Sequence, residues 1–359
     1  MLQPIMKVNE IRKKIDRVDR RILGEISERA KLVKAIGALK VKAGADVYVP
    51  HREKNIVSRL IKRNRGPLAP PAVESIFREI VNACRSLEKK LTVAYFGPEA
   101  TYTHQAAMKN FGAGAAFVPV RTIADVFTEV EKGRANYGVV PIENSTEGII
   151  NHTLDMFVDS DLVICSEVSL PIEHCLLSLS GDMSKIKKLY SHTQPLLQCR
   201  NWIERNLPSA AVVEASSTAE AARCASKDAS AAAIASKAAA QAYGLEIISE
   251  GIEDSKENFT RFLVIGTTTA QYSGQDKTSV MFSIKDKVGA LHDMLMPFKK
   301  NGITLTKIES RPTRKKAWEY IFFIDFLGHV SEKGVQKALA ELGRQCIFLK
   351  VLGSYPKAE

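Results

Sequence analysis

The chain has 359 residues, a formal net charge of +11, 45% hydrophobic and 25% charged residues, which is typical of a globular protein of roughly two or three domains and not of a disordered or fibrous chain. It lacks the ~18-residue apolar stretch of a membrane span, and its start lacks the apolar core of a signal peptide. The six cysteines are scattered and form no CxxC pair, so we expect a cytoplasmic protein without structural zinc.

The positive charge is concentrated in the first quarter of the chain. Residues 1–91 hold 22 Lys and Arg against 10 Asp and Glu, whereas the remaining residues hold 29 against 30. Three interpretations are open on composition alone: a solvated helical surface, a patch that binds nucleic acid, or a site for a small polyanion.

The first domain, residues 1–91, is predicted to be an all-α unit of three helices. Apolar residues recur at spacings of three and four from Val8 to Ile36, which predicts one helix over residues 7–43 that ends at Gly44. Further helices are expected from Pro50 to about residue 63 and from about residue 71 to 89. Because a helix ~50 Å long cannot bury its apolar stripe on two shorter ones, we expect a dimer that shares helices.

Strands alternate with helices over the second domain, residues 92–268. Two such sets are joined by an extended run at residues 162–179, which predicts parallel sheets covered by helices in two lobes with a cleft between them, an α/β arrangement like that of periplasmic binding proteins. Residues 267–277 have the composition of a linker. The order strand, helix, strand, strand, helix, strand over residues 276–359 then predicts a ferredoxin-like α+β domain.

Two cations fall on the apolar face of the first predicted helix. Arg29 and Lys40 share the spacing of Val33 and Ile36, so they need an anionic partner unless their side chains extend to the surface. Their positions are ~16 Å apart along the helix, which lets two long side chains converge on one ligand. Arg12 is ~25 Å from Arg29 and can contribute only from a second subunit.

The segments IRKKIDRVDRRIL, SERAKLVKAIGALK and HREKN resemble the all-helical chorismate mutase family over residues 1–90. The resemblance implies the pericyclic rearrangement of chorismate to prephenate, which needs a positioned dianion and donors aimed at the oxygen where negative charge develops. It implies three arginines on the two carboxylates, a lysine at the ether oxygen, an acid at a hydroxyl and two residues on the far wall. The arginines are Arg12 of the partner subunit, Arg29 and Arg52. The lysine is Lys40 and the acid is Glu53. Cys84 and Glu88 form the far wall.

Three positions depart from residues that some family members carry. Val49 stands in place of an acid, Cys84 in place of Ser and Glu88 in place of Gln. A carboxylate at position 88 would repel the developing negative charge, so we expect it to function only when protonated.

Three motifs of the second domain place hydroxyls, amides and backbone N–H groups at strand ends, where they suit a carboxylate. They are YFGPEATYTHQAA, PIENSTEG and NFTRFLVIG. Ser145 and Thr146 are equally typical of a helix cap. Together the motifs resemble prephenate dehydratase over about residues 92–267, and the whole chain resembles the bifunctional chorismate mutase–prephenate dehydratases of phenylalanine biosynthesis.

The second resemblance implies loss of CO₂ and water from prephenate to give phenylpyruvate. It implies that Thr260 lies at the leaving hydroxyl and that Arg261 supplies positive charge either to the substrate or to the sheet edge. The other implied substrate-binding residues are Asn144, Ser145 and Thr146, with Thr101, His192 and Gln194 on facing walls. Ala100, Thr103 and Thr193 replace the usual Gly, Ser and Pro, and Ala100 is expected to crowd the first loop. The proton donor is not identifiable from the sequence.

The third domain carries GALHDML and ESRP, which resemble the amino-acid-binding ACT domain. The resemblance implies feedback inhibition by phenylalanine at a site between paired domains, and therefore a homodimer or tetramer; a plain dimerisation module is the alternative. The implied site residues are Gly289, Ala290, Leu291, Glu309, Ser310 and Arg311.

Two other function classes stay open. A solute-binding protein would close on its ligand without turnover. A nucleic-acid-binding protein would show steep salt dependence, but only Tyr48 and Phe77 place aromatic rings in the basic segment. We expect an enzyme that acts on chorismate and prephenate and binds phenylalanine, with no nucleic acid, membrane, cofactor or metal.

Overall fold

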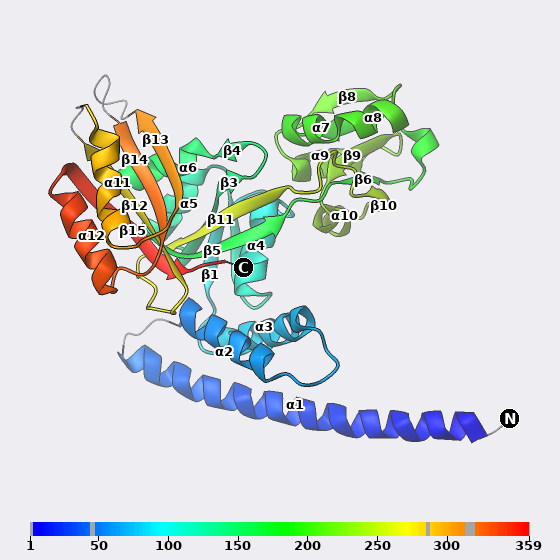
Figure 1. Ribbon diagram of the computed structural model, residues 1–359. Helices are drawn as coiled ribbons and strands as arrows, with labels where there is room; N and C mark the ends of the chain where they lie inside the picture. The colour runs from blue at the N-terminus through cyan, green and yellow to red at the C-terminus, as the bar shows by residue number, and fades with distance from the viewer. Residues whose placement is uncertain (1–2, 44–46, 285–287, 313–319, 359) are drawn as a thin grey trace. The chain divides into compact units, whose positions relative to one another are not determined.

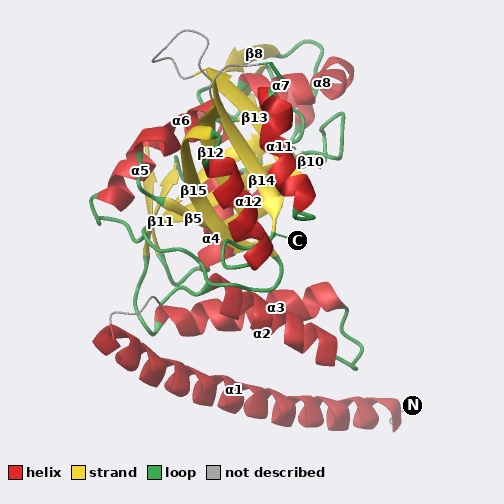
Figure 2. Cartoon of the chain, turned by 60° about the vertical axis from the view of Figure 1, so that its left-hand side comes forward, coloured by secondary structure: helices red, strands yellow, loops and turns green. Residues whose placement is uncertain are grey.

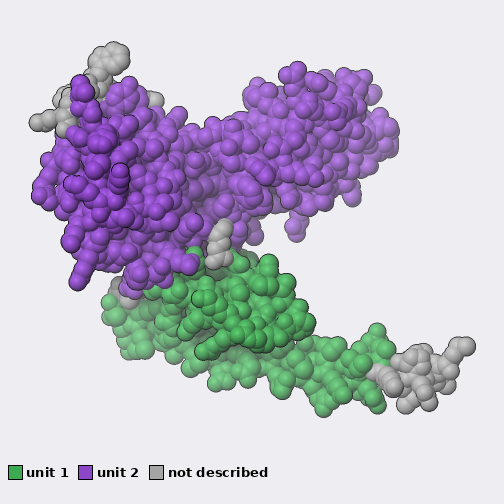
Figure 3. Space-filling view, viewed as in Figure 1, with its two compact units in different colours: residues 1–91, 111–116 green, residues 92–110, 117–359 purple. Residues whose placement is uncertain are grey.

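The computed structural model describes residues 3–43, 47–284, 288–312 and 320–358. The chain divides into two compact units, residues 1–91 with 111–116 and residues 92–110 with 117–359, which Figure 3 colours separately. No helix within the described residues is both long and apolar enough to cross a membrane.

The first unit contains the three predicted helices. They are α1 (Gln3–Ala43), α2 (Pro50–Arg63) and α3 (Pro70–Ser86). Proline occupies the first turn of α2 and of α3, where its missing N–H costs nothing. Helix α3 ends earlier than expected, because Leu87 turns back to donate its backbone N–H to Cys84. The predicted stop at Gly44 lies outside the described residues.

The second unit begins with a six-stranded sheet in the order β2-β1-β3-β11-β5, with β4 paired to β3. Figure 1 shows α4, α5 and α6 around it. The elements are β1 (Thr92–Phe96), α4 (Tyr102–Phe111), β2 (Ala116–Val120), α5 (Ile123–Glu131), β3 (Tyr137–Asn144), β4 (Gly148–Ile149), α6 (Asn151–Asp159), β5 (Val163–Pro171) and β11 (Phe259–Gly266).

A five-stranded sheet in the order β10-β6-β9-β7-β8 forms the second lobe of this unit. Its elements are β6 (Cys175–Ser178), the 3₁₀ turn η1 (Met183–Lys185), β7 (Lys188–Ser191), α7 (Thr193–Gln198), α8 (Arg200–Asn206), β8 (Ala211–Glu214), α9 (Thr218–Ala225), β9 (Ala231–Ala235), α10 (Lys237–Tyr243) and β10 (Glu246–Glu250). The two predicted lobes are therefore present.

The expectation of parallel sheets is wrong for part of each sheet. β1 and β3 are parallel, as are β7, β8 and β9, but β11 is antiparallel to both β3 and β5, and β6 is antiparallel to β9 and β10. The antiparallel strands are those that carry the chain from one lobe to the other and back. Strand β5 leads into the second lobe and β11 returns from it, so β11 runs in the opposite direction to β5.

The C-terminal domain has the predicted ferredoxin-like order, with its sheet arranged β13-β14-β12-β15 and α11 and α12 on one face (Figure 2). Its elements are β12 (Asp276–Ile284), α11 (Ala290–Lys300), β13 (Leu305–Pro312), β14 (Tyr320–Leu327), α12 (Lys333–Gly343) and β15 (Cys346–Pro356).

The other face of this sheet shares a hydrophobic core with the first lobe. Ile164 of β5 and Leu263 of β11 belong to the same buried cluster as Met281 and Phe323 of the C-terminal sheet. The approach is so close at Gly353 that an added Cβ would lie 2.3 Å from the carbonyl oxygen of Ile164. The C-terminal sheet therefore packs directly on the strands that carry the second predicted site.

Candidate active sites

A small cavity of about 70 Å³ lies among the three helices of the first unit. It brings together every residue predicted for this site within one subunit, namely Arg29, Lys40, Arg52, Glu53, Cys84 and Glu88. Arg12 is exposed on α1 and does not line the cavity.

The cavity holds more positive charge than its own carboxylates satisfy. Lys40 Nζ lies 2.8 Å from Glu88 Oε2 and also donates to the carbonyl of Val47 at 3.2 Å. One terminal guanidinium nitrogen of Arg29 is buried with no hydrogen-bond partner among the described residues. Buried N–H groups are almost always paired in proteins, so this one indicates an anionic ligand.

Arg85 is a part of this site that the sequence reasoning missed. It donates to both carboxylate oxygens of Glu53, at 2.8 and 2.9 Å, and to the carbonyl of Phe111 at 2.9 Å. Its guanidinium group lies 5.0 Å from the centre of the Tyr48 ring. Burial raises the pKa of Glu53 above its usual value despite the nearby Arg85. The available signal was the position of Arg85 one turn after Val81, on the buried face of α3.

A larger cavity of about 680 Å³ lies in the second unit and is lined from both lobes. It brings together five of the predicted residues, Thr101, Asn144, His192, Gln194 and Thr260. Thr101 follows β1, Asn144 ends β3 and Thr260 lies near the start of β11, whereas His192 caps α7 in the second lobe.

Asn144 is the centre of a hydrogen-bond network in this cavity. Its Nδ2 donates to Thr260 Oγ1 and to Asn258 Oδ1, both at 2.8 Å. Asn258 donates to Gln198 Oε1 at 3.0 Å, and His174 Nε2 lies 2.8 Å from the same oxygen. Because Thr260 accepts from Asn144, its own hydroxyl proton is free to point toward a ligand.

Two ionisable groups of the cavity have displaced pKa values. Burial lowers the pKa of His174 below its usual value, and burial raises the pKa of Glu147 although Gln198 donates to it at 2.9 Å. The sequence reasoning missed both groups, as well as Gln198 and Asn258. Glu147 lies in the quoted PIENSTEG motif, and its carboxyl was the available signal.

Ser145 and Thr146 are not among the residues that line the cavity, although they stand between Asn144 and Glu147, which are. Ser145 Oγ accepts the backbone N–H of Phe259 at 2.9 Å and donates to the carbonyl of Glu257 at 3.1 Å. Thr146 donates its backbone N–H and its hydroxyl to Asn144 Oδ1 at 3.0 and 2.6 Å. Both residues hold the loop and the Asn144 amide in place.

Of the two roles expected for Arg261, positive charge for the substrate or for the sheet edge, its contacts favour the second. Successive side chains of a strand point to opposite faces, so Thr260 and Phe262 line the cavity while Arg261 points away from it. Its guanidinium group instead contacts Glu167 and Asp325, each at 2.6 Å.

Ala100 lies in the loop before α4 in a left-handed backbone conformation. This residue has φ +64° and is the one non-glycine of positive φ in the described chain, which fits the glycine that the resemblance leads us to expect there. Thr101 still points its hydroxyl inward along the loop and donates to the carbonyl of Pro98 at 3.0 Å.

The residues predicted to bind phenylalanine lie at two places in the C-terminal domain. Gly289, at φ +79°, precedes α11, whose first residues are Ala290 and Leu291. Glu309, Ser310 and Arg311 lie on β13, and Arg311 contacts Asp155 of α6 at 3.2 Å.

Comparison with known proteins covers all three parts of the chain. The model of chorismate mutase type II matches residues 11–89, that of prephenate dehydratase residues 93–270 and that of the ACT domain residues 278–344. A prephenate dehydratase of Arthrobacter aurescens, solved in complex with L-Phe, is 35% identical over 74% of this chain and 90% of its own, with a TM-score of 0.69.

Two curated relatives match the chain from end to end. Both are bifunctional chorismate mutase/prephenate dehydratases. That of Aquifex aeolicus is 52% identical over 356 residues, and that of Pseudomonas aeruginosa is 45% identical over 360 residues. Each match spans 98% of both chains. The chain therefore belongs to the family of bifunctional chorismate mutases/prephenate dehydratases.

Proposed function

We propose that this chain rearranges chorismate to prephenate in the helical cavity and converts prephenate to phenylpyruvate in the larger cavity. The observation that carries the proposal is that two separate cavities gather the six mutase residues expected from one subunit and five of the residues expected for the dehydratase. The chain that holds them is matched over 98% of its length by a bifunctional relative.

The helical cavity suits a reaction without proton transfer. Arg29 and Arg52 offer guanidinium groups to the two carboxylates of chorismate, and Lys40 offers its ammonium group to the ether oxygen. Negative charge develops on that oxygen as the C–O bond breaks, so a fixed cation stabilises the transition state more than the substrate. Substrate binding requires Lys40 to exchange part of its contact with Glu88.

The larger cavity suits an elimination. Thr260 donates its hydroxyl proton as a hydrogen bond to the departing hydroxyl of prephenate, and Asn144 fixes the orientation of Thr260. Loss of CO₂ from the ring carboxylate supplies the electrons, the C–O bond to the hydroxyl breaks, and the ring becomes aromatic. Glu147 is our candidate for the donor of the proton that converts the leaving hydroxyl to water, because it lines the same cavity and burial raises its pKa.

We further propose a dimer that shares α1. Val8, Ile11, Ile15, Val18 and Ile22 form an apolar stripe on this helix, and each exposes between 41% and 56% of its surface. A continuous apolar stripe on a helix marks an interaction surface. Pairing of two chains through this stripe would let Arg12 of one chain reach the helical cavity of its partner. There it would bind the substrate carboxylates together with the partner's own arginines.

Phenylalanine is proposed as a feedback inhibitor bound by the C-terminal domain. The support is the chemistry of Gly289 and Ala290, whose N–H groups begin α11 and favour a carboxylate, together with the relative solved with L-Phe. A cytoplasmic location is proposed because all six cysteines are free thiols.

The test is to supply the purified full chain with chorismate and to follow chorismate, prephenate and phenylpyruvate over time. We expect prephenate to rise and then to be replaced by phenylpyruvate. Lys40→Met should stop the first step while added prephenate is still consumed, and Thr260→Val should let prephenate accumulate. Chorismate that is bound but unchanged would favour a binding protein instead.

A further inference from the structure

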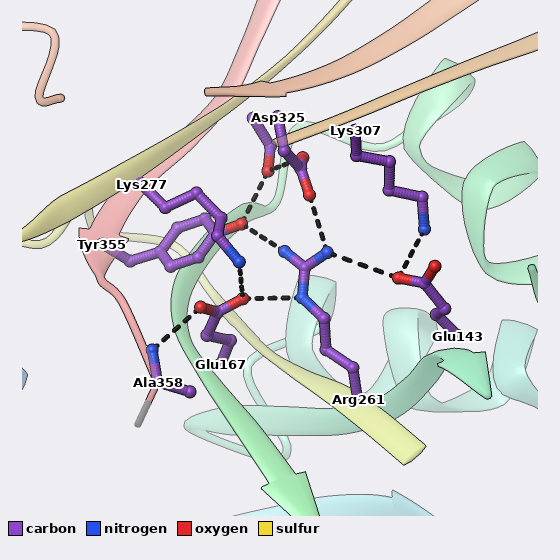
Figure 4. Close-up of polar contacts among 9 residues, drawn as sticks. Glu143, Glu167, Arg261, Lys277, Lys307, Asp325, Tyr355 and Ala358 are labelled. Carbon is purple, nitrogen blue, oxygen red and sulfur yellow. Dashed lines mark hydrogen bonds and ion pairs between the residues drawn. The ribbon is translucent and has the colours of Figure 1, made fainter. Parts of the chain in front are cut away.

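Six charged side chains form a cluster on the face of the first sheet that is opposite the larger cavity (Figure 4). Three come from the dehydratase strands and three from the C-terminal sheet that packs on them. The first three are Glu143 of β3, Glu167 of β5 and Arg261 of β11; the others are Lys277 of β12, Lys307 of β13 and Asp325 of β14.

Every ion pair between the two sheets is short. Arg261 Nη1 lies 2.6 Å from Asp325, Lys277 Nζ lies 2.9 Å from Glu167, and Lys307 Nζ lies 2.8 Å from Glu143. Arg261 also pairs with Glu167 of its own sheet at 2.6 Å. The cluster thus joins three strands of the dehydratase sheet to three strands of the C-terminal sheet.

The charges balance only when the two sheets are together. The dehydratase side carries two carboxylates and one cation, and the C-terminal side carries two cations and one carboxylate. The side chain of Glu167 is 2% exposed and that of Asp325 is 12% exposed. Buried charges without partners are strongly unfavourable, so these ion pairs favour a single position of one sheet on the other.

Arg261 and Asp325, at the centre of the cluster, favour each other's charged forms. Burial alone would lower the pKa of Arg261, but Tyr355, Asp325 and Glu167 raise it above its usual value. Burial alone would raise the pKa of Asp325, but Arg261 and Ser279 lower it. This pair therefore links the two sheets as an ion pair.

The same two strands present the reacting side chains on their other face. Thr260 is paired with Asn144 across β11 and β3, and the adjacent pair in the register is Arg261 with Glu143. Each member of the ion cluster on these strands is thus one peptide bond from a residue of the cavity. A shift of Arg261 or Glu143 must move Thr260 or Asn144, because the backbone between them has no free length.

We propose that the ion cluster is the device by which the C-terminal sheet positions Thr260 and Asn144 for dehydration, with Arg261 and Glu143 as positioning residues. The inference rests on the proposed dehydratase function and deepens it.

Strand β13 gives the device a route from the predicted phenylalanine site. Lys307, Glu309 and Arg311 alternate with more exposed neighbours along this strand, so they lie on one face of it. Lys307 holds Glu143, and Glu309 and Arg311 belong to the predicted phenylalanine site. Lys307 lies only four positions before Arg311 on β13. A displacement of this strand by bound phenylalanine therefore moves Lys307 and, through their ion pair, Glu143, which precedes Asn144.

The experiment compares Glu143→Gln, Lys307→Met and their double variant in the full chain. The melting temperature of the second unit measures its folding, and mutase activity measures the unaltered first unit. Each single change should lower the dehydratase kcat about tenfold or more, since small displacements at a reacting centre cost up to ~100-fold, and KM should change less. The double variant should be no worse than the poorer single variant, because the two side chains act as one pair. Phenylalanine should inhibit all three variants more weakly than the original chain.

Asp155→Asn is the matched control, because it removes the contact of Arg311 with α6 at 3.2 Å, a contact between the same two regions in which none of the six cluster residues takes part. Its dehydratase kcat should match that of the original chain. If Lys307→Met loses mutase activity and melts early, Asp325→Asn tests the Arg261 arm by the same measurements.

The outcomes separate the two proposals. An original chain without dehydratase turnover would overturn the proposed function itself. An active original chain whose folded variants keep kcat and phenylalanine inhibition unchanged would overturn this inference alone, as would effects that simply add in the double variant.

Discussion

The two cavities solve different chemical problems with different kinds of side chain. The helical cavity, of about 70 Å³, is lined by Arg29, Lys40, Arg52, Arg85 and two carboxylates. The larger cavity, of about 680 Å³, is centred on Asn144, Asn258, Gln198 and the hydroxyl of Thr260. Charges thus dominate the first site and neutral hydrogen-bonding groups the second.

The difference follows from the reactions. A pericyclic rearrangement moves electrons but no proton, so fixed charges in a tight site are sufficient. Dehydration must transfer a proton and release two small products, which requires hydroxyl, amide and carboxyl groups with room between them. In the second unit the paired charges of the ion cluster lie on the opposite face of the sheet, where they contact neighbouring strands and not the cavity.

Removal of Lys40 should have the largest effect, on the charged site alone. Lys40→Met deletes the cation that we propose to face the ether oxygen, and loss of one such group costs about 10²–10³ in rate. The mutase kcat should fall by that amount while prephenate is converted at the original rate. Steady-state assays with chorismate and with prephenate measure the two separately.

Lys34→Met is the matched control, because Lys34 is exposed on the same helix. It should leave both activities unchanged. A Lys40→Met variant that retains mutase turnover would remove the basis for treating the helical site as electrostatic.

Thr260 tests the neutral site. Thr260→Val keeps the shape of the side chain and deletes the hydroxyl, and it should lower the dehydratase kcat by about 10² with little change in KM. Thr260→Ser keeps the hydroxyl and should retain most of the activity. Equal losses in the two variants would mean that packing, and not the hydroxyl, is what the cavity requires.

Much of the fold was accessible from the sequence, because its signals are local. The spacing of apolar residues from Val8 to Ile36 located α1, and the prolines at the starts of α2 and α3 located their first turns. The mixed direction of the strands was not accessible, because it depends on how β11 returns between lobes more than 80 residues after β5 begins.

The site residues also divide into those that local sequence motifs reveal and those whose role depends on distant segments. Lys40, Glu53 and Glu88 lie in or near recognisable motifs, and the cavity gathers them as expected. Arg85 and Arg261 show the limit. The identity of each residue was visible, but its partners come from elements far away in the sequence, such as Glu53 for Arg85 and Asp325 for Arg261.

Glu88 tests the electrostatics of the helical site with the opposite sign. Its Oε2 lies 2.8 Å from Lys40 Nζ, and on the proposed assignment a carboxylate there repels the negative charge that develops on the ether oxygen. Glu88→Gln replaces the carboxylate by a neutral hydrogen-bond donor, so mutase kcat/KM should rise. Steady-state assays with chorismate measure the change, and an unchanged or lower kcat/KM in this variant would contradict the role assigned to Glu88.

Ala100 should show the smallest effect, on the stability of the second unit. Its φ of +64° costs a non-glycine residue about 1–2 kcal/mol, and glycine would return about 0.5–1 kcal/mol of that as lost chain entropy. Ala100→Gly should therefore stabilise this unit by up to ~1 kcal/mol and raise its melting temperature. Ala107→Gly is the control of opposite sign, because Ala107 is buried within α4 and glycine there weakens a helix. If both variants lower the melting temperature equally, glycine is no better at position 100 than inside a helix. The left-handed conformation of Ala100 then carries no strain.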